Sequence, residues 1–114
     1  AAHYGLDNLI CIVDRNGVQI DGPTSHVMEL EPLSLKWAAF GWHVITCNGN
    51  YIPDILNAFD EARSIVGMPK VILAQTVMGK GVASIENDYH WHGKAPNQEE
   101  AQKFLLELEN RTTL

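Results

Sequence analysis

The chain has 114 residues, of which 46% are apolar and 19% charged, and its formal net charge is −6. This length suits one domain or a part of one, and this composition excludes a disordered chain. Eight basic against 14 acidic residues, with no basic cluster, argue against binding to nucleic acid or to an anionic membrane surface. No apolar run approaches the ~18 residues of a membrane span, and the amino terminus lacks the pattern of a secretory signal.

Three short apolar runs predict three β-strands, at residues 9–13, 42–46 and 70–75. The first run, LICIV, shows no alternation of apolar and polar residues, which is typical of a strand buried on both faces of a parallel sheet. A sheet of only three strands has exposed edges. The chain therefore has the pattern of a part of a larger α/β domain.

Three amphipathic segments predict helices at residues 32–40, 53–66 and 99–108. The first two begin at a proline and end before a glycine, as helices commonly do. Strands and helices alternate along the chain, and this order predicts an α/β fold: a parallel sheet with right-handed helical crossovers.

Ligands of parallel sheets bind beyond the carboxyl ends of the strands. Those ends lie here at residues 14–19, 47–50 and 76–81, which are rich in asparagine and glycine. The sequence therefore directs the search for a functional site to these three segments.

Cysteine usage indicates a reducing compartment. Cys11 and Cys47 lie in apolar segments, and two cysteines are too few for a disulfide framework. We interpret Cys11 as a small buried apolar side chain and expect a cytoplasmic protein.

Residues 14–22 contain the first candidate site. Asn16 and Gly17 both tolerate positive φ and predict a tight turn directly after a strand. Such a turn can direct the Asn16 side-chain oxygen and the Val18 backbone carbonyl to one point, and Mg²⁺ prefers oxygen ligands of this kind. An ordinary strand-to-loop turn explains the same residues, because Asn-Gly is common in turns.

Residues 76–81, with two glycines around Lys80, resemble a phosphate-binding loop but do not match the Walker A spacing. A solvated surface loop is the alternative.

In residues 90–96, Trp91 separates His90 from His92. Histidine carries protons near neutral pH and pairs with phosphate when charged. Zinc is disfavoured, because no further ligands stand at zinc-site spacing, and a structural loop held by Trp91 is the alternative.

The remaining candidates have structural explanations. His43 lies within a predicted strand and is expected to be packed or hydrogen-bonded. The acidic residues Glu29 and Glu31 precede a predicted helix, where negative charge is favourable.

Together these segments resemble the thiamine-diphosphate domain of transketolase. The matching stretches, in the order of the family, are LDNLICIVDRNGVQIDGPT (6–24), LKWAAFGWHVI (35–45), CNGN (47–50), the loop at 76–81 and WHGKAP (91–96). The similarity covers residues 6–108 and is closest to the N-terminal subunit of split, two-chain transketolases.

The resemblance implies a role for four residues. Asn16 would coordinate Mg²⁺ and touch the diphosphate, and the Val18 carbonyl would be a second Mg²⁺ ligand. Ile20 would pack against the cofactor. His92 would contact the diphosphate region and face the sugar, positioning cofactor and substrate and transferring protons.

The chain also departs from the family pattern. It contains no Gly-Asp-Gly, the half of the motif that supplies the carboxylate ligand of Mg²⁺, and Met78 stands where some relatives carry a lysine. The family's substrate-funnel histidines and the glutamate of the pyrimidine-type domain are absent as well. We therefore expect residues 1–114 to be the C-terminal portion of a thiamine-diphosphate-binding domain, inactive in isolation.

The resemblance implies a transketolase that moves a two-carbon ketol unit from a ketose phosphate to an aldose phosphate in the pentose phosphate pathway. Its cofactors would be thiamine diphosphate and Mg²⁺. Its partners would be sugar phosphates and a pyrimidine-type domain or C-terminal subunit, in a dimer or heterotetramer.

Two alternatives remain open. A 1-deoxyxylulose-5-phosphate synthase shares the Gly-Lys-Gly and Trp-His-Gly elements, although residues 19–24 favour transketolase. A non-catalytic fragment that serves only in assembly is the other.

Overall fold

The computed structural model describes residues 1–111. The chain forms two compact units, one of residues 1–16 and 30–76 and the other of residues 17–29 and 77 onward. The predicted α/β fold is confirmed, because parallel strands alternate with helices in the first unit.

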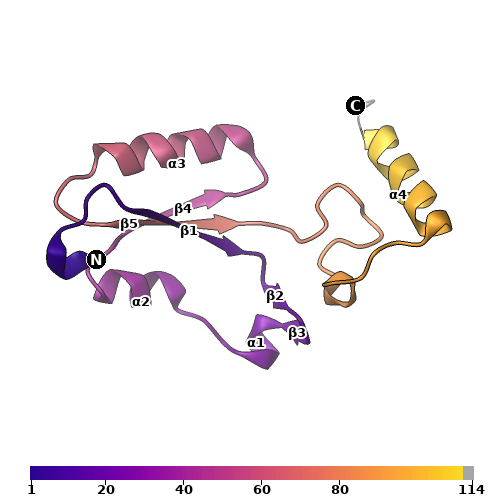
Figure 1. Ribbon diagram of the computed structural model, residues 1–114, viewed down its shortest axis with the longest axis horizontal. Coiled ribbons are helices and arrows are strands. Elements are labelled where there is room, and N and C mark those ends of the chain that lie inside the picture. Colours follow the sequence, from indigo (N-terminus) through magenta and orange to yellow (C-terminus); the bar gives the residue numbers. More distant parts are fainter. Residues whose placement is uncertain (112–114) are drawn as a thin grey trace. The chain divides into compact units, whose positions relative to one another are not determined.

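The first unit contains a parallel sheet of β1 (Ile10–Arg15), β4 (His43–Asn48) and β5 (Lys70–Gln75), in the order β1-β5-β4 (Figure 1). All three predicted strands are present. The last has the expected bounds, and the other two begin one residue and end two residues later than expected. β5 lies in the centre, and Val71 on it has no exposed surface.

Two helices of this unit cover opposite faces of the sheet (Figure 1). They are α2 (Leu33–Ala39), which contacts β4, and α3 (Ile52–Ser64), which contacts β4 and β5. A short 3-10 helix, η1 (Ala2–Tyr4), precedes the sheet. Since β1 and β4 are joined through α2, and β4 and β5 through α3, the expected crossover connections are confirmed.

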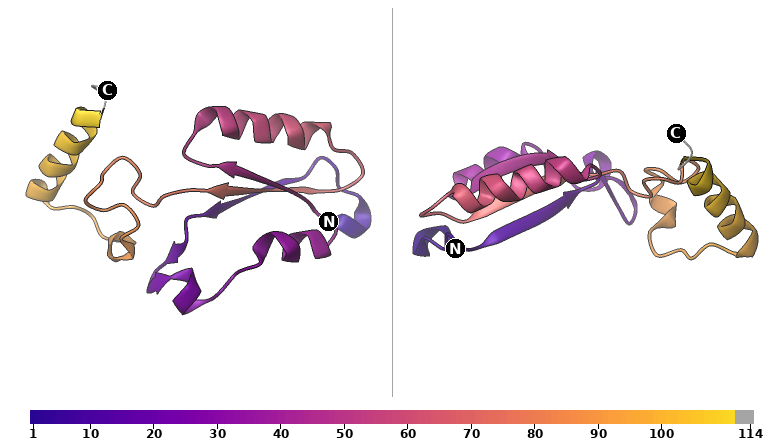
Figure 2. Two further views of the ribbon diagram at one scale, coloured as in Figure 1. Left: turned by 180° about the vertical axis from the view of Figure 1, so that it is seen from behind. Right: turned by 90° about the horizontal axis from the view of Figure 1, so that it is seen from above.

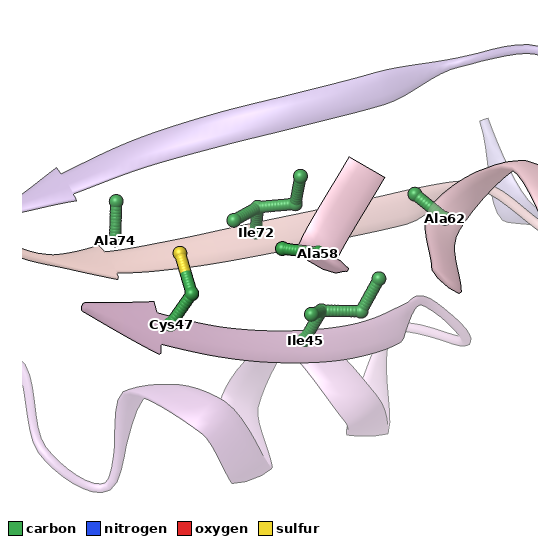
Figure 3. Packing of buried hydrophobic residues seen from close by; sticks show 6 residues of the cluster. All are labelled: Ile45, Cys47, Ala58, Ala62, Ile72 and Ala74. Carbon is green, nitrogen blue, oxygen red and sulfur yellow. The ribbon is translucent and has the colours of Figure 1, made fainter. Parts of the chain in front are cut away.

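Two further views show α3 lying along the sheet (Figure 2). Small residues on α3 allow it to pack closely there. Ala58 and Ala62 are four residues apart and therefore share one face of the helix. The buried core contains these two alanines and the strand residues Ile45, Cys47, Ile72 and Ala74 (Figure 3). This packing fixes α3 on β4 and β5, and Ile10 of β1 packs against the same core.

β1 and β4 form the edges of the sheet within residues 1–111. The exposed edges expected from a three-stranded sheet are thus observed. The first strand was expected to be buried on both faces, but Ile12 on β1 is 56% exposed and Cys11 is half-buried. β1 is an edge strand, and α3 packs mainly on β4 and β5.

The second unit is built from short elements and one longer helix. A two-residue pair of antiparallel strands, β2 (Val18–Gln19) and β3 (Gly22–Pro23), is followed by α1 (Thr24–Val27). The 3-10 helix η2 (Tyr89–Trp91) precedes α4 (Gln98–Arg111). Only α4 was predicted, because the others are too short to show a hydrophobic period.

None of the helices in the described part of the chain combines the length and the apolar character that membrane crossing requires.

Candidate functional site

The carboxyl end of β1 is held by the residue that follows β5. The backbone N–H of Thr76 donates to the carbonyl of Arg15 at 3.5 Å, and the Thr76 hydroxyl donates to the carboxylate of Asp14. Asn16 follows directly and still belongs to the first unit. The sheet therefore fixes the backbone from which the Asn16 side chain projects.

Arg15 is committed to an internal ion pair. Its Nε and Nη2 atoms donate to Oε1 of Glu31 at 3.1 and 2.9 Å, while Oε2 of Glu31 accepts from the Leu33 N–H at 2.9 Å. The Leu33 N–H and the Arg15 guanidinium lower the pKa of Glu31. Glu31 thus caps α2, as expected for an acidic residue before a helix.

Gly49 allows the turn after β4 to lie against β5. Its N–H donates to the Gln75 carbonyl at 2.7 Å. A Cβ at this position would lie 2.5 Å from Cγ2 of Thr76 and 2.9 Å from Cβ of Ala74. Only glycine fits here without displacement of the neighbouring strand end.

Two chemically reactive residues of β4 have structural roles. Burial, and then the nearby Asp54 carboxylate, raise the pKa of the Cys47 thiol, which keeps it protonated and unreactive. Nε2 of His43 lies 2.9 Å from Oε1 of Glu61, so the expectation of a hydrogen-bonded strand histidine is confirmed.

In the second unit, a tight hairpin presents Ile20 to solvent. The carbonyl of Gly17, whose φ is 76°, accepts from the N–H of Thr24 at 2.9 Å and from its hydroxyl at 3.3 Å. Gln19 pairs with Gly22, so Ile20 and its neighbour form a two-residue loop. The Ile20 side chain is 65% exposed and is available to contact an apolar surface.

The turn that carries His92 is fixed by its backbone. The Asp88 carboxylate accepts from the His90 N–H at 3.1 Å and lies 2.6 Å from Nδ1 of His90. These bonds from the His90 side chain and backbone lower the pKa of Asp88. The N–H of His92 donates to the Tyr89 carbonyl at 2.9 Å, and Gly93 has a φ of 76°. His92 itself is exposed.

Contacts between β3 and η2 bring the hairpin and the His92 turn together within the second unit. Of the four residues expected at the site, this unit holds Val18, Ile20 and His92, and the first unit holds Asn16. Two segments that are distant in the sequence are therefore neighbours in the fold.

The Gly-Lys-Gly loop uses its donors internally. The N–H of Lys80 donates to the Val77 carbonyl at 3.2 Å, and the N–H of Gly81 donates to Oε1 of Glu86 at 3.2 Å. Nζ of Lys80 lies 3.5 Å from the same carboxylate oxygen. These contacts favour the surface-loop interpretation over a phosphate cradle.

The expected donors of a cation site are neutral oxygens. Across residues 1–111, no group of three or more histidine, cysteine, aspartate and glutamate side chains is arranged to hold a metal ion. Amide and backbone carbonyl oxygens, the donor types expected of Asn16 and Val18, are ligands that Mg²⁺ accepts alongside anionic oxygens. Phosphate oxygens and a carboxylate are ligands of that kind.

The model of the family described as transketolase, thiamine diphosphate binding domain, matches residues 1–109. The chain belongs to this family. The resemblance read from the motifs is confirmed.

Several transketolase proteins are similar to this chain. An apulose-4-phosphate transketolase subunit of Phocaeicola vulgatus is 38% identical over 108 residues, which are 95% of this chain and 38% of the relative. The 6-deoxy-6-sulfo-D-fructose transketolase subunit SqwG of Clostridium sp. is 39% identical over 104 residues, or 91% of this chain and 38% of the relative. The present chain thus spans less than half the length of these subunits.

A solved structure supports the fold. The crystal structure of transketolase from Campylobacter jejuni superimposes with a TM-score of 0.84 at 28% identity, covering 96% of this chain and 17% of that one. The present chain therefore has the architecture of a segment of the larger transketolase.

Some contacts around the candidate site were not foreseen. For the hydrogen bonds from Thr76 to β1, the only signal in the sequence is that Thr76 directly follows a predicted strand. For the hydrogen bond from the His90 N–H to the Asp88 carboxylate, the only signal in the sequence is the two-residue spacing. Asn97 and Glu100 form a capping box, which the Asn-x-x-Glu spacing could have indicated.

Proposed function

We propose that residues 1–114 are the C-terminal portion of a thiamine-diphosphate-binding domain and form one side of a transketolase active site. Residues 112–114 lie outside the described part of the chain. The family match over residues 1–109 is the observation that carries this proposal. The open edge at β1 and the exposed Ile12 support a sheet that continues beyond these residues.

The proposed reaction moves a two-carbon ketol unit from a ketose phosphate to an aldose phosphate, as in the pentose phosphate pathway. We propose that the enzyme is cytoplasmic. Thiamine diphosphate, when bound, supplies the nucleophilic carbon that this carbon–carbon bond chemistry needs. The similar proteins are named for different sugars, apulose 4-phosphate and 6-deoxy-6-sulfo-D-fructose. The donor sugar is therefore a question for experiment.

The residues around Gly17 would hold the diphosphate end of the cofactor. The Asn16 amide oxygen and the Val18 carbonyl would bind Mg²⁺, and Asn16 would also touch the diphosphate. A cation is needed because the chain carries a net charge of −6 and the diphosphate is itself anionic. The exposed Ile20 at the hairpin tip would pack against the apolar part of the cofactor.

His92 would position the cofactor and the sugar and exchange a proton with a sugar hydroxyl. Three features support this role: the residue is exposed, its backbone is held by η2, and its turn lies beside the hairpin that carries Ile20. Imidazole is the side-chain group best suited to donate and accept protons near neutral pH.

A second protein segment would complete the site. The similar proteins are named as subunits, which implies a partner in those enzymes. For this chain we propose a pyrimidine-type domain or C-terminal transketolase subunit, within a dimer or heterotetramer, and we expect residues 1–114 alone to be inactive.

A donor assay on the complete enzyme with its partner tests the reaction class. With thiamine diphosphate and Mg²⁺ present, a panel of ketose phosphates that includes xylulose 5-phosphate should each be offered with an aldose phosphate. We expect ketol transfer from at least one ketose and none from pyruvate. Condensation of pyruvate instead would favour a 1-deoxyxylulose-5-phosphate synthase, and no turnover with any donor would favour a non-catalytic role.

A further inference from the structure

Both residues that flank the His92–Gly93 turn are attached to α4. The Trp91 ring meets the Phe104 ring edge-on, with centroids 5.1 Å apart and planes at 76°. Nζ of Lys94 lies 3.9 Å from the centroid of the Trp91 ring. The N–H of Lys94 donates to the Trp91 carbonyl at 3.3 Å. The turn is therefore closed on itself and packed against the helix that follows it.

Glu100 links Lys94 to the start of α4. Its Oε1 atom accepts from Nζ of Lys94 at 2.9 Å, and its Oε2 atom accepts from the Asn97 N–H at 2.8 Å. The Asn97 side chain in turn accepts from the Glu100 N–H at 2.9 Å. The Asn97 N–H and the Lys94 ammonium lower the pKa of Glu100, so the carboxylate is charged at neutral pH.

The position of the Lys94 ammonium distinguishes two roles for this residue. A lysine that serves as a ligand for an anion presents its ammonium group to solvent or to the ligand. Here the Lys94 side chain is half-exposed, but its ammonium lies over one ring and against one carboxylate. An isolated surface ion pair contributes little, but a cation held against both an aromatic face and a helix cap restricts the backbone between them.

We propose that Lys94 and Glu100 act together as positioning residues for His92, fixing its turn on α4. This inference rests on the proposed function, because it assigns the pair to the reaction through His92. Neither side chain is a ligand of cofactor or sugar in this account. Their effect passes through the backbone of residues 91–94.

The test compares matched variants of the complete enzyme with its partner. Lys94→Met removes the cation, and Glu100→Gln removes the charge while keeping an oxygen for the Asn97 N–H. The double variant measures coupling, and Lys94→Arg restores a cation. Lys103→Met, which removes another lysine of α4 and its contact with Glu107, is the control.

We expect Lys94→Met and Glu100→Gln each to lower kcat by about fivefold, and the double variant to lose no more than either single one. Lys94→Arg should recover most of the loss, and the control Lys103→Met should keep wild-type kcat. Thiamine diphosphate affinity should stay within about twofold throughout. Amide hydrogen exchange in residues 91–95 of the cofactor-free enzyme should accelerate in both single variants.

A different pattern would overturn the proposal. If Lys94→Met weakened thiamine diphosphate or sugar affinity while Glu100→Gln changed nothing, Lys94 would be an anion ligand. Unchanged exchange in residues 91–95 would show that the pair does not hold the turn. Exchange is measured without substrate, so it tests the attachment of the turn to α4 even if the donor assay detects no transfer. A failure of this proposal and a failure of the proposed function are therefore distinguishable.

Discussion

At the scale of single residues, the exposed His92 directly follows the 3-10 helix η2. The N–H of His92 donates to the Tyr89 carbonyl at 2.9 Å. Its side chain projects from a fixed backbone in the same unit as Ile20. A general acid–base group, the role proposed for His92, contributes through correct placement as much as through pKa.

Replacement of His92 by alanine tests its proposed role. We predict that kcat of the complete enzyme falls by about 100-fold, because a positioned proton carrier is lost, while the fold is retained. The measurement is steady-state ketol transfer with circular dichroism on the same samples. His26→Ala, a change at another exposed histidine of this unit, is the matched control. Wild-type kinetics for His92→Ala would remove this residue from the site.

Individual residues differed in how far their sequence context revealed their role. Asn16-Gly17 was predicted to form a turn, and Gly17 has the positive φ of 76° that such a turn requires. The attachment of Lys94 to Glu100 was not predicted, because it depends on the packing of Trp91 against α4. The metal and cofactor roles of Asn16 and Val18 remain predictions.

At the scale of elements, the contact between the β4 turn and β5 depends on Gly49. Gly49→Ala would force its Cβ to within 3 Å of Thr76 and Ala74. We predict that the free energy of local opening falls by about 1–3 kcal/mol, the usual cost of overpacking. Amide exchange of β4 and β5 in the complete enzyme should measure this change.

The matched control for Gly49→Ala is Asn57→Ala, which removes an exposed side chain on α3. Protection of β4 and β5 should be unchanged in that variant. If amide exchange in the Gly49→Ala variant equalled that of wild type, the end of β5 would relax at little cost. The close approach of the Gly49 turn to β5 would then not be needed.

Acid should weaken the helix ends first. Hydrogen bonds at helix starts lower the pKa values of Glu31, Asp88 and Glu100, and hydrogen bonds from Ser84 in the preceding loop lower that of Glu107. These pKa values lie below the ordinary values of 4.5 for glutamate and 3.8 for aspartate. A lowered pKa means that the stabilisation is fully present above the ordinary value and is lost as pH falls through the lowered one.

We therefore predict constant protection of the first turns of α2 and α4 between pH 7 and pH 5 and a progressive loss below about pH 4. Amide exchange, corrected for its intrinsic pH dependence, measures this. In a Glu100→Gln variant the α4 turn should lose its acid sensitivity while that of α2 persists. Acid sensitivity of α4 in that variant would contradict the assignment.

The longer elements were predictable from the sequence and the shorter ones were not. All three strands follow from apolar runs, and α2, α3 and α4 follow from amphipathic patterns, with proline and glycine marking the ends of the first two. The hairpin at residues 18–23 and η2 contain too few residues for a period to appear. Their mutual contact, which joins Ile20 and His92 in one unit, could be found only in the structure.

At the scale of the whole molecule, the sheet of residues 1–111 ends at two open edges. The sequence predicted such edges from three strands, and it predicted a first strand buried on both faces, whereas Ile12 on β1 is exposed within these residues. β1 is an edge strand, and α3 packs mainly on β4 and β5. This chain spans less than half of the similar subunits, which supports a larger sheet in the complete enzyme.

The Mg²⁺ dependence of thiamine diphosphate binding tests the central claim most directly. It should be measured by calorimetry on the complete enzyme, in wild type, Asn16→Ala and the control Asn110→Ala. We predict that wild type and control bind the cofactor with strong Mg²⁺ dependence, and that Asn16→Ala loses about 10- to 100-fold in this Mg²⁺-dependent affinity. Unchanged affinity in Asn16→Ala would contradict the assignment of the carboxyl end of β1 to the diphosphate and its cation.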